Sequence, residues 1–285
     1  MVGRRPLGPQ GFTLLEALVA MVLSSVVVML VTSVFMAQNR FYSETVKRAA
    51  LHESVRTAAA LVSSEMRGLT AGGIVAAEPD SLMIRAPLVM GVVCGVDERK
   101  SYIFLPLGGE AFGADEVSGY ALRAADGSWS YRDGGWASFH HSSGSGPAGV
   151  CAEAGSDVRG AVADFHRLDD LAASGSLRPG DLVMLYQERV LKLATSVLDP
   201  STMGIYRGPS GSTLSEAVTG LTGESGFRYE LPSQPGFQDR VLGTGNLQSI
   251  QRIQFTAAGA SPSGRPGGGS STFRLTATVP PKNVR

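Results

Sequence analysis

An uninterrupted apolar run occupies residues 12–37, and Glu16 is its only charged residue. At roughly 1.5 Å per residue, a helix of this length extends about 39 Å, which is enough to cross the hydrocarbon core of a bilayer. Arg4 and Arg5 precede the run, and basic flanks stay on the cytoplasmic side of a membrane. The pattern therefore predicts one transmembrane helix, with the remainder of the chain on the other side.

Beyond the apolar run, the spacing of hydrophobic positions becomes that of an amphipathic helix. Residues 38–67 contain no Pro or Gly, and three glycines shortly after Arg67 provide a stop. One apolar stripe recurs at spacings of three and four, formed by Leu51, Val55, Ala59, Val62 and Met66. We predict a single helix from Phe12 to about Arg67, whose second half packs along a globular head.

After Gly73 the apolar spacing changes to two, which is typical of strands. Strands are expected at residues 81–86, 102–107, 120–123, 128–132, 182–186, 190–197, 253–255 and 273–279, the last two joined by a loop at 259–270. A helix is expected at residues 158–171. A long helix with its stripe covered by a sheet of antiparallel strands predicts an α+β fold.

Composition supports a folded head and weakens one class of partner. The 43% hydrophobic and 18% charged residues argue against disorder, and the 36 glycines are consistent with many turns. Lys+Arg and Asp+Glu both number 25. The usual sequence signal for nucleic-acid binding, a clustered basic face, is therefore missing.

The two cysteines, Cys94 and Cys151, both follow the apolar run. If that run delivers them to an oxidising compartment, their even number predicts one disulfide. Closing a loop of about 58 residues would stabilise the fold by roughly 4 kcal/mol. Two free, buried thiols are the alternative.

No motif for catalysis, cofactor binding or metal binding is complete. Residues 52–56 begin like H-E-x-x-H but end in Arg56, so the second zinc ligand is missing. No lysine follows a glycine, as a Walker A loop requires, and no G-x-S-x-G sequence occurs. We therefore expect no enzyme, no cofactor and no metal site.

Glu16 needs a partner, because a carboxylate deep in a bilayer costs about 2.5 to 3.5 kcal/mol. A free amine on Phe12, four residues upstream, would be such a partner if the chain were cut between Gly11 and Phe12. Between neighbouring subunits of an assembly, the same ion pair would set register as well as attraction.

The sequence GFTLLE at residues 11–16, after a short basic leader and before an apolar helix, resembles the processing motif of type IV prepilins and type II secretion pseudopilins. The resemblance implies cleavage after Gly11 by a prepilin peptidase, N-methylation of Phe12 and a role for Glu16 in assembly. It implies a leader at 1–11, a transmembrane half-helix at 12–37, an amphipathic half-helix at 38–70 and a β-rich head at 71–285.

Within this family the chain is most similar to the large minor members, the PilW-like minor pilins and the J-type pseudopilins. Main pilins commonly carry a Pro about twenty residues after the cut, whereas this chain has none between Phe12 and Glu78. Main pilins are also usually much smaller.

The resemblance implies a minor pilin in the tip or priming complex of a type IV pilus. The alternatives are a J-type pseudopilin of a type II secretion system, or a tip adhesin or DNA-uptake pilin. The implied partners are the prepilin peptidase, other pilins or pseudopilins and inner-membrane lipid. The implied location is the bacterial inner membrane with a periplasmic head, and afterwards the pilus or pseudopilus.

Overall fold

A computed structural model of the protein describes residues 13–70, 72–97, 100–104, 116–124, 126–133, 138–141, 165–169, 178, 180–261 and 271–281. The chain divides into two compact units. One consists of Met1–Ala50 and Ser261–Ser270, and the other of Leu51–Ala260 and Ser271–Arg285.

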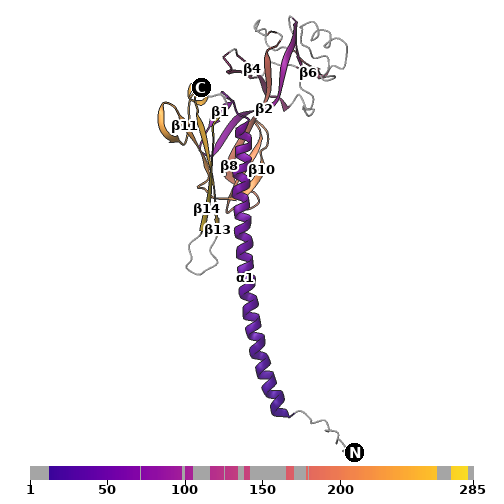
Figure 1. The fold of residues 1–285 in the computed structure, drawn as a ribbon, viewed down its shortest axis with the longest axis vertical. Helices are drawn as coiled ribbons and strands as arrows, with labels where there is room; N and C mark the ends of the chain where they lie inside the picture. Colours follow the sequence, from indigo (N-terminus) through magenta and orange to yellow (C-terminus); the bar gives the residue numbers. More distant parts are fainter. Residues whose placement is uncertain are drawn as a thin grey trace, which may run out of the picture. The chain divides into compact units, whose positions relative to one another are not determined.

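The predicted long helix is confirmed as α1, Leu14–Arg67, drawn in indigo in Figure 1. It runs for 54 residues without interruption, because the segment contains no proline and no glycine that would break the hydrogen-bond ladder. Phe12, where we expected the helix to begin, lies outside the described residues.

Within the second unit, the described strands form two antiparallel sheets, which confirms the α+β class. The larger has ten strands: β1 Ile74–Ala77, β2 Ser81–Asp97, β3 Lys100–Phe104, β4 Gly119–Arg123, β5 Trp129–Asp133, β6 Ser138–His141, β7 Phe165–Asp169, β8 Leu182–Thr195, β9 Met203–Pro209 and β10 Ser215–Leu221. The smaller has four: β11 Gly226–Leu231, β12 Gln234–Gln238, β13 Arg252–Ser261 and β14 Ser271–Val279. A short helix, α3 Thr244–Gln248, precedes β13.

Strands β2 and β8 form the spine of the larger sheet. They pair from Ser81 opposite Lys192 to Val92 opposite Leu182. On its other edge, β8 pairs with β4 over its first half and with β9 over its second half. One long strand thus carries different neighbours at its two ends.

The main core lies where α1 meets both sheets. The buried stripe of α1 from Val55 to Met66 shares one hydrophobic cluster with residues of β1, β2, β8, β9, β10, β11 and β13. Gly259 of β13 allows this close approach, because a Cβ there would overlap the Leu51 side chain and lie 3.0 Å from Val55 Cγ2. A separate cluster, formed by Val93, Val117, Tyr120, Val183 and Leu185, joins β2, β4 and β8.

Most strand predictions are confirmed, including the hairpin of β4 and β5, the β13–β14 pair and the start of β2. The expected single sheet over the helix is in fact two sheets. The loop predicted to begin at residue 259 is also wrong there, because β13 continues to Ser261.

The expected break between residues 182–186 and 190–197 is wrong, because β8 continues through Gln187, Glu188 and Arg189. These polar side chains do not interrupt the strand, since each finds a partner. Gln187 accepts a hydrogen bond from Arg189, and Glu188 lies near Arg85.

The helix expected at residues 158–171 is also wrong over Phe165–Asp169, which form β7. That segment pairs with β3 on one side and β6 on the other. Two rows of interstrand hydrogen bonds outweigh a weak local preference for helix. Residues 158–164 lie outside the described part of the chain.

Candidate functional site

The described part of the first unit begins at Thr13, which caps α1. The Thr13 hydroxyl accepts a hydrogen bond from the Glu16 backbone N–H at 3.3 Å. A Thr followed three residues later by Glu is the pattern of a capping box, in which the Glu carboxylate would bond back to the Thr N–H. Among the described contacts only the hydroxyl half of that box is formed.

Glu16 is therefore exposed in the first turn of α1, and no ion pair to it occurs among the described residues. A carboxylate in a first helical turn is favoured by the helix dipole, typically by about 0.3 to 1 kcal/mol. That effect favours the charge but leaves the carboxylate oxygens free to contact a group outside this helix.

Past Glu16, α1 exposes apolar side chains on every side as far as Met36. Three of its hydroxyl side chains bond to the helix backbone: Ser25 to Val22 O at 2.7 Å, Thr32 to Val28 O at 2.8 Å and Ser33 to Leu30 O at 2.7 Å. These bonds satisfy the polar groups internally, as a lipid environment requires. By length and composition alone, α1 is the helix in the described ranges that could span a membrane.

Several predicted site residues cannot be placed. Gly11, Phe12 and Cys151 lie outside the described residues. Cys94 belongs to strand β2, but its side chain is not among those described. The cleavage site and the disulfide therefore stay predictions.

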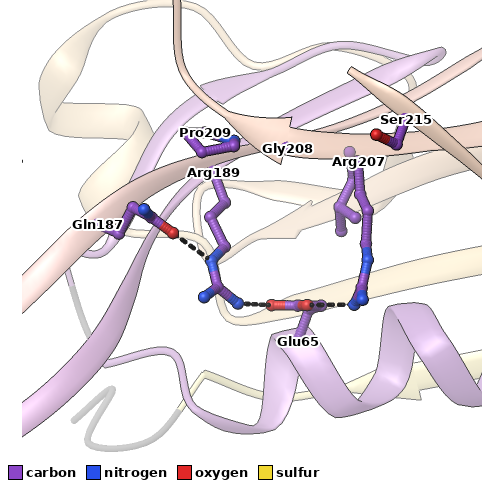
Figure 2. Close-up of a pocket in the computed structure, with 8 residues that line it drawn as sticks. Glu65, Gln187, Arg189, Arg207, Gly208, Pro209 and Ser215 are labelled. Carbon is purple, nitrogen blue, oxygen red and sulfur yellow. Dashed lines mark hydrogen bonds and ion pairs between the residues drawn. The ribbon is translucent and has the colours of Figure 1, made fainter. Parts of the chain in front are cut away.

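On the second unit, an open cavity of about 330 Å³ lies beside the last turn of α1. Figure 2 shows the Glu65 carboxylate between two guanidinium groups, with Arg189 NH1 at 3.4 Å and Arg207 NH1 at 3.3 Å. Gln187 accepts a hydrogen bond from Arg189 Nε at 2.8 Å. The three charges come from α1, β8 and β9, so they fix the end of the helix to the larger sheet.

A second polar cluster surrounds Arg85 of β2. Its NH2 donates to Asp133 at 2.7 Å and its NH1 to the Gly72 carbonyl at 3.3 Å. The guanidinium lies 4.9 Å from the Tyr131 ring centroid and 5.5 Å from that of Tyr186, within the range of cation–π attraction. The cluster joins β2, β5, β8 and the segment after α1.

This cluster is not suited to acid–base chemistry near neutral pH. Burial raises the pKa of Tyr186, and the hydrogen bond it donates to Asp133 raises it further. Burial also raises the pKa of Tyr131. Both hydroxyls therefore stay protonated. Tyr186 donates to Asp133, and Tyr131 shares a hydrogen bond with the Thr70 hydroxyl, which indicates a structural role.

Glu188, on β8, lies at the edge of the Arg85 cluster. Burial raises the pKa of its carboxyl, with Arg85 acting in the opposite direction and Asp133 adding to the rise. The ion pair is loose, because Glu188 Oε1 lies 3.7 Å from Arg85 Nε, and that Nε is buried without a hydrogen-bond partner. The charged form of Glu188 is thus less favourable in the folded chain than in water.

Sequence reasoning missed both head clusters. Glu65 lies directly before Met66, the last residue of the apolar stripe, and carries no distinguishing pattern. Arg85, Arg189 and Arg207 are far from their partners in the sequence. Only the pairing of β2, β8 and β9 brings them together. No group of three or more potential metal-ligating side chains occurs within the part of the chain that the structure describes.

Residues 9–32 match a family model described as the prokaryotic N-terminal methylation motif. A search of curated proteins found no match, and a search of solved structures found none either. The motif supports a type IV pilin or pseudopilin, which is a family of structural subunits. Together with the apolar helix, it fits processing by a prepilin peptidase, anchoring in the inner membrane and assembly with other pilins.

Replacing Glu65 by Gln should lower the free energy of unfolding by about 1 kcal/mol. Glu65 is 11% exposed, but its partners Arg189 and Arg207 are 37% and 52% exposed, so solvent screens the two ion pairs. Urea unfolding of the full chain in detergent would measure the change. The matched control is Glu53→Gln, on the exposed face of the same helix. We call the two ion pairs of Glu65 with Arg189 and Arg207 the Glu65 clamp. Equal effects of the two substitutions on the free energy of unfolding would contradict it.

In contrast to Glu65→Gln, the substitution Glu188→Gln should raise the free energy of unfolding at neutral pH. Its folded-state pKa lies above the usual 4.5, so the folded state binds the proton more tightly. Stability is therefore lost as pH rises from the unfolded-state pKa through the folded-state pKa. The variant should be more stable than the wild type at pH ~7 and lose that advantage near pH ~4. Unfolding at both pH values tests this, and a variant less stable at pH ~7 would refute it.

Proposed function

We propose that this chain is a minor pilin of a type IV pilus, a structural subunit of the tip or priming complex that promotes assembly. The observation that carries the proposal is the first part of α1, in which apolar side chains are exposed on every side and Glu16 is the single charge before Ala37. Such a surface is not stable in water. It needs lipid, or the equivalent helices of other subunits.

Glu16 supplies the specificity of that assembly. Cleavage after Gly11 would create an amine at Phe12, and a prepilin peptidase is the expected processing enzyme. The carboxylate has no partner among the described residues, so the amine of a neighbouring subunit is available to it. Because unpaired charge in an apolar surrounding is costly, the pair would favour one register of packing over others.

A minor role, in preference to a filament-building role, rests on two features. Helix α1 is unbroken over 54 residues and lacks the helix-loosening Pro that main pilins commonly carry. The head carries sheets of ten and four strands, a large body to repeat along a shaft.

The same proposal assigns the remaining parts of the chain. Residues 1–11 are the leader, 12–37 span the inner membrane, and 71–285 form a periplasmic head that later reaches the cell surface. Residues 38–70 connect them, and their packing on the head begins near Leu51. Once exported, Cys94 and Cys151 would form a disulfide.

Mass spectrometry of the N-terminal peptide from native membranes tests the processing step. We expect a peptide that begins at a methylated Phe12, because the leader ends at Gly11. A chain that still begins at Met1 or Val2 in cells with an active prepilin peptidase would overturn the proposal.

Replacing Glu16 by Val tests the assembly step. Because Val carries no charge, the variant should insert at least as well as the wild type and remain in the membrane. It should nevertheless fail to enter filaments, as measured by its amount in sheared pili. The control is Val19→Leu, which leaves the charge in place. Normal incorporation of Glu16→Val would contradict the ion pair.

Deletion of the gene distinguishes a role in a type IV pilus from a role in a type II secretion system. Loss of pili is the result expected for a minor pilin. Loss of protein export with normal piliation would instead identify a pseudopilin of a type II secretion system.

A further inference from the structure

Within the first unit, two exposed aromatic residues follow the apolar run of α1. The run ends at Ala37, three polar residues follow, and then come Phe41 and Tyr42. Their side chains are 73% and 70% exposed. Exposed neighbouring aromatic rings on a helix that is otherwise polar at this point call for a physical reason.

Aromatic rings at the end of a membrane-spanning helix have a well-defined preference. Trp and Tyr concentrate at the boundary between hydrocarbon and headgroups, because their rings are apolar and their polar atoms need water. Arg40, directly before the pair, is also exposed, and its guanidinium can reach lipid phosphates from that depth. We call Arg40, Phe41 and Tyr42 the interfacial anchor.

We propose that this interfacial anchor binds the outer headgroup boundary of the bilayer, and that it thereby holds Glu16 at the inner boundary and out of the hydrocarbon. The proposal rests on the proposed function only in requiring that α1 spans the membrane.

Distances along α1 support this placement. Glu16 and Phe41 are separated by 25 positions of continuous helix, or about 38 Å. The hydrocarbon core is about 30 Å thick, and about 40 to 45 Å with its headgroup layers. A tilt of about 20° shortens the span to about 35 Å. The helix thus places both residues within opposite headgroup layers, a few ångströms outside the hydrocarbon.

The placement also answers the question raised by the charge in the apolar run. A carboxylate near the bilayer centre is costly, and snorkelling to the interface relieves much of that cost. At the inner boundary Glu16 stays hydrated in the free subunit. Its first-turn position, with the Thr13 cap on the backbone, leaves the carboxylate ready to pair when another subunit arrives.

Quenching of tryptophan fluorescence by brominated lipids tests whether position 41 lies at the outer headgroup boundary. The full unprocessed chain, made without prepilin peptidase, is placed in phosphatidylcholine–phosphatidylglycerol nanodiscs with lipids brominated near the headgroup or near the chain end. The indole of a Phe41→Trp variant should be quenched at least about twofold more by the shallow bromines, and that of Leu30→Trp by the deep ones. The wild-type chain gives the background from its 2 native tryptophans.

Substitution of Phe41 and Tyr42 tests whether the interfacial anchor fixes the depth of α1 in the bilayer. In the Leu30→Trp background, the added changes Phe41→Ser and Tyr42→Ser should shift the ratio of deep to shallow quenching, because the helix loses its fixed depth. Val46→Ser is the matched control: Val46 is 47% exposed, one turn farther from the apolar run. An unchanged ratio in the double variant, or an equal shift in the control, would overturn the anchor.

Chemical labelling tests whether Glu16 lies at the inner headgroup boundary. In the same nanodiscs, a water-soluble carbodiimide with glycine ethyl ester should modify Glu16 to at least half the extent of exposed Glu53, as measured by peptide mass spectrometry. Labelling of Glu16 by dicyclohexylcarbodiimide alone would place it in hydrocarbon and refute the inference, with the proposed function intact. Absence of bromine quenching at Leu30→Trp would instead show that α1 does not enter the bilayer, and the proposed function would fall with it.

Discussion

The rest of this structure depends on how the apolar surface of α1 is covered. From Leu51 onward, both sheets of the second unit cover one stripe of the helix, and the buried residues of the two sheets and the helix form one cluster. Before Ala50 the helix surface is exposed on all sides. One continuous helix therefore serves as the core element of a folded head and as a surface that needs an external apolar partner.

The polar residues of the head serve this packing. Glu65 holds the last turn of α1 against β8 and β9 through two arginines. Arg85 gathers Asp133, Tyr131 and Tyr186 around the segment that follows the helix. In the Arg85 cluster, burial raises the pKa of Tyr131 and of Tyr186, so their hydroxyls stay protonated at neutral pH. Both clusters are better understood as links that fix the helix to the sheets.

Glu16 differs from the charged residues of the two head clusters in whether it has an ion-pair partner among the described residues. In the two head clusters, Arg85, Arg189 and Arg207 pair with carboxylates of the same chain. The raised pKa of Glu188 reflects the cost of desolvating a carboxylate there. Glu16 has no partner among the described residues and relies on its position at a helix end.

The sequence by itself determined the features that depend on local pattern. The length of α1, its buried stripe, the β4–β5 hairpin and the position of Glu16 near the helix start all follow from spacing and from the residues that begin or end a helix. The methylation motif matched at residues 9–32 is equally local, because it is a short run of consecutive residues.

Only the tertiary structure decided the features that depend on distant partners. Residues 187–189 stay in one strand because Arg85, Glu65 and neighbouring strands satisfy them, and residues 165–169 become β7 because β3 and β6 pair with them on both sides. The ion pairs of Glu65 likewise join positions more than a hundred residues apart, and the second sheet forms only when separate strands between residues 226 and 279 pair. Such contacts leave no periodic signal, since each arises from the packing of elements and not from the order of residues within one.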